Sequence, residues 1–374
     1  MTTVTALRLY GRQKIQLDKV EPLPCGKDDV RLKIGYCGIC GSDIHEFLGT
    51  PIFAPAAGTV NEFTKIGLPV VMGHEFSGTV TEVGPEVTNV KVGQKVCVNP
   101  SLNDRHHGFE SCSQCEEGKP NLCKRWATYG LNASGGGFAN EIVLKSSNCL
   151  VLPDDVPLKI GALAEPLAVA WHCIRTSGFK AGQTALILGA GPIGLAILVL
   201  LKAWNAEKIF ITEVTQQRAK QAQAFGADKV INPLENIADG KVNGAATDPV
   251  LAATKEATAD GFDVAFDCTG MQSTLDTGLA AIRPGGTFFN VAIHEKPLSF
   301  NPNDVSFLEK KILGGLCYTD DDFKEVIAVM ASGKIPFEQM ITSIVPLSKV
   351  VDGGFNELLN NKAQHVKILI QPDE

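Results

Sequence analysis

The chain has 374 residues, of which 44% are hydrophobic and 20% charged, so it is long enough for two or three globular domains. The formal net charge of −7 and the lack of a long basic run argue against nucleic acid or an anionic membrane as the main partner. The N-terminus has no signal-peptide pattern, and the longest apolar run is too short to span a bilayer. We therefore expect a cytoplasmic protein whose eleven cysteines are metal ligands or buried thiols.

The first part of the chain is β-rich. Between residues 4 and 98, short alternating runs such as 30–36 (VRLKIGY) and 76–84 (FSGTVTEVG) are broken by glycine and proline, a pattern typical of strands and turns. No helical period persists for long, so we predict an irregular antiparallel barrel. Residues 99–137 are predicted to form a loop.

The second part of the chain alternates strands with helices. The predicted strands are 184–188, 208–212, 229–231, 263–266, 287–291 and 311–316. Helical stretches separate most of them, such as 215–225, which Gly226 would cap. Six such strands predict an α/β fold with a doubly wound parallel sheet. Two more helices, near 321–332 and 349–360, precede a final strand at 365–371.

A glycine pattern joins the first of these strands to a helix. Gly189, Gly191 and Gly194 stand as G-x-G-x-x-G, and Pro192 suits the first turn of the helix. The first glycine allows a tight turn, the second lets the backbone approach a pyrophosphate, and the third lets the helix pack close to the strand. The helix N-terminus would then face the phosphates. Alone, the pattern is also compatible with a turn that binds nothing.

The next strand ends at an acidic residue. Glu213 follows strand 208–212, and 213 minus 189 gives the spacing of 24 at which an acid meets the adenosine ribose hydroxyls. Because Glu213 would repel a 2′-phosphate, the sequence favours NAD over NADP.

Possible zinc ligands stand in the β-rich part. Cys40 lies in CGICGSDIHE, and His74 and Glu75 follow in a Gly-His-Glu phrase. Cysteine and histidine are good zinc ligands, and here they would come from different loops of one scaffold. Cys37 lies where the strand should still be running, so we predict that it packs in the core.

The phrase GHEFSGTVTEVGPEV, residues 73–87, resembles the signature of zinc-containing medium-chain dehydrogenases. Glu165, in Ala-Glu-Pro, stands where the classical alcohol branch carries a cysteine ligand, so the chain resembles the polyol branch. The stretch 45–75, with its Gly-Thr-Pro-Ile-Phe insertion, is similar to the butanediol dehydrogenase group. The resemblance implies a GroES-like catalytic domain in 1–166, a Rossmann NAD-binding domain in 167–317, and a return to the catalytic domain in 318–374.

The resemblance also implies the ligands of a catalytic zinc. Carried over residue by residue, it makes Cys40, His74 and Glu165 the ligands, with water or substrate oxygen in the fourth place. Glu75 remains the rival carboxylate, and it counts among the catalytic residues. Asp43 resembles the partner that orients the histidine ligand.

The same family pattern assigns the proton relay and the rest of the cofactor site. Ser42 and His45 match the relay from substrate oxygen to solvent. Zinc, as a Lewis acid, would favour loss of the alcohol proton, after which the carbon gives hydride to NAD. Ile193, Arg218 and Cys268 join the predicted cofactor-binding residues.

A second cysteine group indicates a structural zinc. Cys112, Cys115 and Cys123 give C-x2-C-x7-C, three of the four cysteines of the family's lobe. The position expected for the first ligand is Phe109. The candidate substitutes are Asp104, His106, His107, Glu110 and the more distant Cys97. Reduced thiols without metal are the alternative interpretation.

The reaction implied is reversible, NAD-linked oxidation of a secondary alcohol beside a second oxygen function, with 2,3-butanediol and acetoin as the first candidate pair. Sorbitol, xylitol and L-threonine are rival substrates. A dinucleotide-binding, crystallin-like protein without turnover is the non-enzymatic alternative, and it would need a broken zinc site. By analogy with the family we expect a homo-oligomer, a dimer or a tetramer, and a small-molecule alcohol or ketone as the partner.

Overall fold

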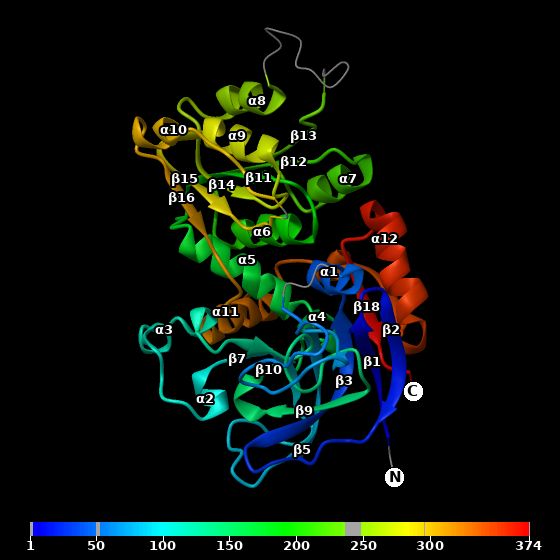
Figure 1. The fold of residues 1–374 in the computed structure, drawn as a ribbon. Helices are drawn as coiled ribbons and strands as arrows, with labels where there is room; N and C mark the ends of the chain where they lie inside the picture. Colours follow the sequence, from blue (N-terminus) through cyan, green and yellow to red (C-terminus); the bar gives the residue numbers. More distant parts are fainter. Residues whose placement is uncertain (1–2, 50–52, 236–247, 295, 374) are drawn as a thin grey trace. The chain divides into compact units, whose positions relative to one another are not determined.

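The computed structural model describes residues 3–49, 53–235, 248–294 and 296–373. The chain divides into two compact units, one formed by Met1–Ala168 with Tyr318–Glu374 and the other by Val169–Cys317 (Figure 1). Among the described residues, no helix combines the length and the apolar character that crossing a membrane requires.

The first unit is a β structure with short helices. Its strands are β1 (Val4–Gly11), β2 (Lys14–Val20), β3 (Asp29–Gly38), β4 (Val70–Val71), β5 (Glu75–Val83), β6 (Lys95–Val98), β7 (Ser101–Leu102), β8 (Ala127–Thr128), β9 (Glu141–Lys145), β10 (Cys149–Val151), β17 (Ile341–Pro346) and β18 (Lys367–Gln371). Its helices are α1 (Gly41–Leu48), α2 (Asp104–His107), α3 (Ser113–Glu116), α4 (Leu158–Gly161), α11 (Asp320–Ala331) and α12 (Glu357–Asn361), and α5 (Ala164–Thr176) crosses the unit boundary.

The main sheet of this unit has seven strands. Its order is β10-β6-β5-β3-β18-β17, and β9 also pairs with β3. Alternate residues of β3 point inward, so Val30, Leu32 and Ile34 are buried in one apolar core. Cys37 is fully buried in the same core while the strand is still running, which confirms its predicted packing role.

The C-terminal segment completes this sheet. Strand β18 pairs antiparallel with β3, joining Leu369 to Gly38 and Ile370 to Cys37. On its other side β3 pairs with β5, which sets Gly38 opposite Glu75. β3 therefore lies between the last strand of the chain and β5, the strand that begins at Glu75 of the Gly-His-Glu phrase.

The second unit contains a parallel six-stranded sheet of order β13-β12-β11-β14-β15-β16 (Figure 1). Its strands are β11 (Thr184–Leu188), β12 (Lys208–Thr212), β13 (Lys229–Ile231), β14 (Phe262–Asp267), β15 (Ile282–Asn290) and β16 (Lys311–Gly314). Its helices are α6 (Pro192–Ala203), α7 (Gln216–Ala224), α8 (Pro249–Ala257), α9 (Gln272–Ala281) and α10 (Pro302–Ser306). Central strand β11 is buried on both faces, as a parallel strand covered by helices requires.

The predicted fold class, a doubly wound parallel sheet plus a β-rich domain, is confirmed, and the first three sheet strands have the predicted ends. Several local predictions were wrong. The stretch 99–137, predicted as a loop, contains the short elements β7, α2, α3 and β8. The barrel region contains α1, an eight-residue helix where no helical period was recognised. The stretch predicted as one helix at 349–360 begins as a π-helical turn, Val350–Asn356, before α12. The final strand begins at Lys367 rather than at residue 365.

Candidate active site and metal clusters

Helix α1 brings four of the predicted site residues to one place. Cys40 is its N-cap, and the Cys40 N–H donates to Asp43 Oδ2 at 2.9 Å, which fixes the start of the helix. Ser42 and His45 lie on the helix and are half-buried, whereas Asp43 is fully buried.

The turn before His74 requires glycine. Gly73 has a φ of +90°, and a Cβ there would lie 2.8 Å from both Cys37 Sγ and the Phe138 ring. This turn presents His74 to α1, where its Nδ1 lies 3.5 Å from Asp43 Oδ1 and its Nε2 lies 3.3 Å from Ser42 Oγ. Asp43 therefore stands where a residue that orients the ring should stand.

The charge state of His74 reflects this setting. Burial disfavours the imidazolium, but the Asp43 carboxylate and Cys40 more than offset that effect and raise the pKa of His74 well above its ordinary value. The neighbouring negative groups therefore favour a positive charge at this position.

Glu75 forms a buried ion pair that the sequence analysis missed. Both carboxylate oxygens lie 2.7 Å from Lys367 Nζ, and the two side chains are 1% and 4% exposed. Lys367 also donates to the Ile39 carbonyl at 3.2 Å. A Cβ at Gly38 would overlap a Glu75 oxygen, so glycine at that position makes room for the pair. The pairing of β18 with β3 creates this contact, and no local feature of the sequence predicts it.

The catalytic cluster joins a thiol, an imidazole and a carboxylate. One ligand atom from each of Cys40, His74 and Glu75 lies within 4.8 Å of the others. Glu165 is buried near them, and burial raises the pKa of its carboxyl to about 7. Glu75 adds to this rise, while His74 and a hydrogen bond from Tyr318 oppose it. These donor types fit zinc, and each glutamate is a candidate for the third ligand.

Strand register assembles the predicted dinucleotide site in the second unit. In the parallel sheet Leu188 pairs with Thr212 and with Asp267, so the residues that follow these three emerge together at the carboxyl edge. Those residues are Gly189, Glu213 and Cys268. In open α/β sheets this edge is where ligands bind.

The glycine turn has the geometry that its sequence predicts. Gly189 has a φ of +101°, Gly191 is the N-cap of α6, and Pro192 opens the helix. A Cβ at Gly194 would overlap the Gly189 carbonyl oxygen, so this glycine allows helix and strand to approach closely. Ile193 is half-buried in the first helical turn.

The remaining residues of the predicted cofactor site lie around this turn. Glu213 Oε2 accepts from the Ala190 N–H at 3.1 Å, and Oε1 accepts from Val214 and Thr215 at 2.9 and 2.8 Å. The carboxylate thus holds the glycine turn and keeps lone pairs for further donors. Arg218 Nη1 lies 4.0 Å from the position of a Cβ on Gly191. Burial raises the pKa of the Cys268 thiol well above its ordinary value, so this sulfur is an inert lining group.

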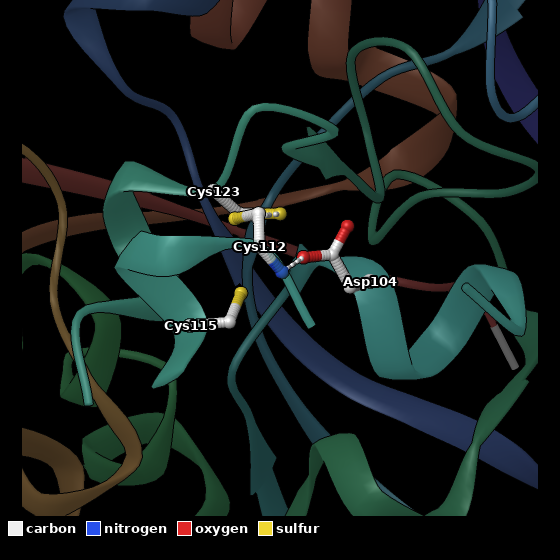
Figure 2. Close-up of side chains that lie close together, drawn as sticks. All are labelled: Asp104, Cys112, Cys115 and Cys123. Carbon is white, nitrogen blue, oxygen red and sulfur yellow. Dashed lines mark hydrogen bonds between the residues drawn. The ribbon is translucent and has the colours of Figure 1, made fainter. Parts of the chain in front are cut away.

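The second cluster contains the three remaining predicted cysteines and Asp104 (Figure 2). Ligand atoms of Asp104, Cys112, Cys115 and Cys123 all lie within 4.8 Å of one another. The Sγ atoms of Cys112 and Cys123 are 3.9 Å apart. Zinc–sulfur bonds of 2.3 Å in a tetrahedron place two sulfurs about 3.8 Å apart. The spacing therefore fits a tetrahedral zinc site.

Asp104 is held in place by two hydrogen bonds. Its carboxylate is fully buried, with Oδ2 accepting from the Cys112 N–H at 2.8 Å and Oδ1 accepting from Arg125 at 2.7 Å. Burial opposes its charge, but these donors more than offset burial and hold the pKa of Asp104 well below its ordinary value. A charged oxygen ligand therefore faces the three sulfurs.

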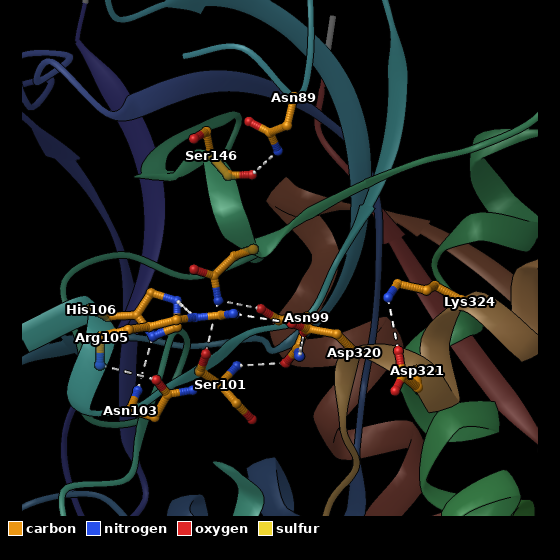
Figure 3. A network of polar contacts seen from close by, with 11 residues as sticks. Asn89, Asn99, Ser101, Asn103, Arg105, His106, Ser146, Asp320, Asp321 and Lys324 are labelled. Atoms are coloured by element: carbon orange, nitrogen blue, oxygen red, sulfur yellow. Dashed lines mark hydrogen bonds and ion pairs between the residues drawn. The ribbon is translucent and has the colours of Figure 1, made fainter. Parts of the chain in front are cut away.

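The other candidate substitutes are engaged elsewhere. The ring nitrogens of His106 lie 3.0 Å from the Asn103 N–H and 3.2 Å from Arg105 Nε, within a polar network that reaches Asp320 (Figure 3). His107 Nε2 lies 3.1 Å from the Arg125 carbonyl. Glu110 is exposed, and Cys97 is buried on β6. Phe109, at the expected cysteine position, lies under the Arg125 guanidinium at 4.6 Å.

Comparisons with known proteins match both parts of the chain to dehydrogenase families. The family described as alcohol dehydrogenase GroES-like domain matches residues 26–154, and zinc-binding dehydrogenase matches residues 192–332. The (R,R)-butanediol dehydrogenase of Saccharomyces cerevisiae is 39% identical over 92% of both chains. Probable D-xylulose reductase A of Aspergillus fumigatus is 33% identical over 97% of this chain and 95% of its own.

A solved structure agrees over the full length. The crystal structure of 2R,3R-butanediol dehydrogenase from Bacillus subtilis matches with a TM-score of 0.89 at 34% identity, covering 99% of this chain and 100% of that chain. The first match contains Cys40, His74 and Glu75, and the second begins at Pro192, within the glycine turn. The chain therefore belongs to the zinc-containing medium-chain dehydrogenase superfamily, a superfamily of oxidoreductases.

Proposed function

We propose that the protein is a zinc-dependent, NAD-linked dehydrogenase that interconverts a vicinal diol and its hydroxyketone, with 2,3-butanediol and acetoin as the first candidate pair. The assembled Cys40, His74 and glutamate cluster carries this proposal, because its donor set fits zinc. The 39% identity to a butanediol dehydrogenase supports the substrate. Part of the insertion that motivates it, residues 50–52, lies outside the described residues.

In this proposal Cys40, His74 and Glu165 hold the catalytic zinc. Glu75 shares both of its oxygens with Lys367, which favours Glu165 as the carboxylate ligand. Zinc would supply Lewis acidity that favours loss of the alcohol proton. The Glu75–Lys367 pair then acts as a neutral, rigid support beneath the cluster.

Ser42 and His45 are proposed to carry the proton away. Ser42 Oγ lies 3.3 Å from His74 Nε2, so it stands beside the nitrogen that faces the metal position. His45 is three residues further along α1 and therefore lies on the same face of the helix. Its half-buried position allows the proton to pass to solvent.

The second unit is proposed to bind NAD at the edge formed by Gly189, Gly191 and Gly194. Glu213, already oriented by three N–H groups, would accept hydrogen bonds from the ribose hydroxyls and repel a 2′-phosphate. Arg218, beside Gly191, would face the phosphates. Cys268 would line the nicotinamide side.

Asp104 is proposed as the fourth ligand of a structural zinc with Cys112, Cys115 and Cys123. The carboxylate uses two of its lone pairs for Cys112 and Arg125, so it can still bind a metal. It would replace the missing cysteine from a position eight residues before Cys112 rather than three.

The test is formation of NADH from each stereoisomer of 2,3-butanediol, before and after chelation and again after zinc is restored. Chelator-sensitive activity that zinc restores is the expected result. Absence of turnover with every vicinal diol would overturn the substrate assignment.

A polyol such as xylitol or sorbitol is the second candidate, favoured by the 33% identity to a probable D-xylulose reductase. The same assay with equal concentrations of these polyols and L-threonine separates the candidates.

A homo-oligomer is also proposed. Strand β16 is at the edge of its sheet, and Ile312 and Leu313 on it are 38% and 40% exposed. Phe307, just before it, is 79% exposed. An exposed apolar edge strand is suited to pairing with the same strand of a second copy. Sedimentation of a Leu313→Glu variant should then show monomers where the wild type shows a dimer or tetramer.

A further inference from the structure

Residues 53–68, here called the bridging segment, connect α1 to the region of the cysteine cluster. At the α1 end the attachment is Glu46, which is 2% exposed. Its Oε1 accepts from the N–H groups of Phe53 at 2.7 Å and Ala54 at 3.2 Å. A buried carboxylate that accepts backbone N–H bonds is a strong, directional attachment.

The bridging segment packs against the cysteine region at two points, at Phe53 beside the Glu46 attachment and at Phe63 further along. The rings of Phe53 and Trp126 are 5.3 Å apart, and those of Phe63 and Phe109 are 6.4 Å apart in an edge-to-face arrangement. Asn132 Nδ2 donates to the Phe53 carbonyl at 3.2 Å. Phe109 in turn lies under Arg125, the residue that holds Asp104.

The segment has internal order of its own. The Asn61 side chain accepts from the N–H groups of Phe63 and Thr64, both at 2.9 Å, and Val60 forms a β-bridge with Gly67. A displacement at one end is therefore transmitted to the other instead of being absorbed by a loose loop.

We propose that Glu46 is a positioning residue that fastens the bridging segment to α1, so that the segment braces the helix carrying Ser42 and His45 against the cysteine region. Glu46 follows Asp43 by one helical turn, so it fixes the part of α1 beyond the buried His74 contact. This inference rests on the proposed function only for its effect on turnover.

Loss of the brace should slow the chemical step more than it weakens substrate binding, because α1 carries the proposed proton relay. Cys40 follows β3 and His74 precedes β5, so both remain held by the main sheet when the segment is released. In Glu46→Ala kcat should fall about tenfold while the KM for the diol changes less than about threefold. Glu46→Gln keeps one acceptor oxygen and should recover part of the lost rate.

The matched control is Glu62→Gln, since Glu62 is exposed within the same segment. Tryptic cleavage after the exposed Lys65 gives a readout that needs no activity. Cleavage should be about tenfold faster in Glu46→Ala than in the wild type, and unchanged in Glu62→Gln.

Phe63→Ala releases the opposite end of the bridging segment. If both ends serve one brace, Glu46→Ala/Phe63→Ala should be no worse than either single variant in kcat and in cleavage rate. Additive effects, or a kcat and cleavage rate of Glu46→Ala equal to those of the wild type, would overturn the proposal. Wild-type protein without diol turnover would refute the proposed substrate, whereas the cleavage experiment would still test the brace.

Discussion

The two metal clusters of the first unit are built in opposite ways. The catalytic cluster draws Cys40, His74, Glu75 and Glu165 from separate places in the first unit, and Lys367 supports it from 292 residues beyond Glu75. The cysteine cluster draws its four residues from one stretch, 104–123. Strand pairing therefore holds the first cluster before any metal arrives, whereas the second depends on the ligands and hydrogen bonds of its own loop.

This difference predicts which property each cluster controls. Changes in the catalytic cluster should abolish activity and leave the loop cluster intact. Changes in the cysteine cluster should reduce stability and metal content while leaving chemistry in place.

The largest effect is expected from Cys40→Ser. Loss of a thiolate ligand should lower kcat by about a thousandfold or more, because the Lewis acid is lost or misplaced. Zinc per chain should fall from two to one, since the cysteine cluster keeps its metal. Metal analysis and NADH assays measure both, with Cys25→Ser as the control. Retention of two zinc ions by an inactive variant would contradict the ligand assignment.

Removing one partner of the buried Glu75–Lys367 ion pair should destabilise the folded protein. Lys367→Met leaves the Glu75 carboxylate buried without its cation, which costs about 3–4 kcal/mol in the free energy of unfolding. Urea unfolding of the chelated protein measures this loss. Glu75→Gln/Lys367→Met should recover most of it, because no charge is then left unpaired.

The catalytic cluster without metal should also lose stability as the pH rises. The pKa of Glu165 is about 7 when folded and near its ordinary value of 4.5 when unfolded, so the folded state binds more protons between these values. The contribution of Glu165 to the free energy of unfolding is therefore fully present below pH 4.5. As the pH rises through 7, up to about 3 kcal/mol of it is lost. The raised pKa of His74 acts in the same direction.

Unfolding of the chelated protein at pH 5.5 and 8 tests this expectation. Glu165→Gln should flatten the profile, because its amide does not titrate. A chelated wild type that becomes more stable towards pH 8 would contradict it.

A change in the cysteine cluster should act on the protein through loss of the zinc ion. Asp104→Ala should reduce zinc from two to one per chain and lower the free energy of unfolding by about 2 kcal/mol, because a ligand and the Arg125 pair are lost together. Asp104→Cys should keep the metal, and Glu110→Ala serves as the neutral control. Two zinc ions in Asp104→Ala would contradict the assignment of the fourth ligand.

The contrast between the two clusters also explains which features could be predicted from the sequence. Strand 184–188 and the glycine turn were predicted correctly, because buried apolar runs and obligatory glycines are local signals. Lys367 was not, since its role follows from the pairing of β18 with β3. Asp104 was one of five candidates, and only the path of the loop distinguishes it from His106 and His107. Helix α1 was missed because eight residues are too few for a clear period.

Strand pairing also positions the glycine turn, as it does the catalytic cluster, because the register of β11 and β12 sets Gly189 beside Glu213. Glu213→Ser should therefore leave the fold intact but lower kcat/KM for NAD about tenfold, through loss of the ribose acceptor and of the N–H bonds that order the turn. Relief of the repulsion should raise kcat/KM for NADP at the same time. Initial rates with both cofactors measure the ratio, and Glu207→Ser, at the opposite end of β12, is the control. An unchanged ratio would mean that Glu213 serves the turn alone, and that cofactor choice is decided by other residues around the glycine turn, such as Arg218.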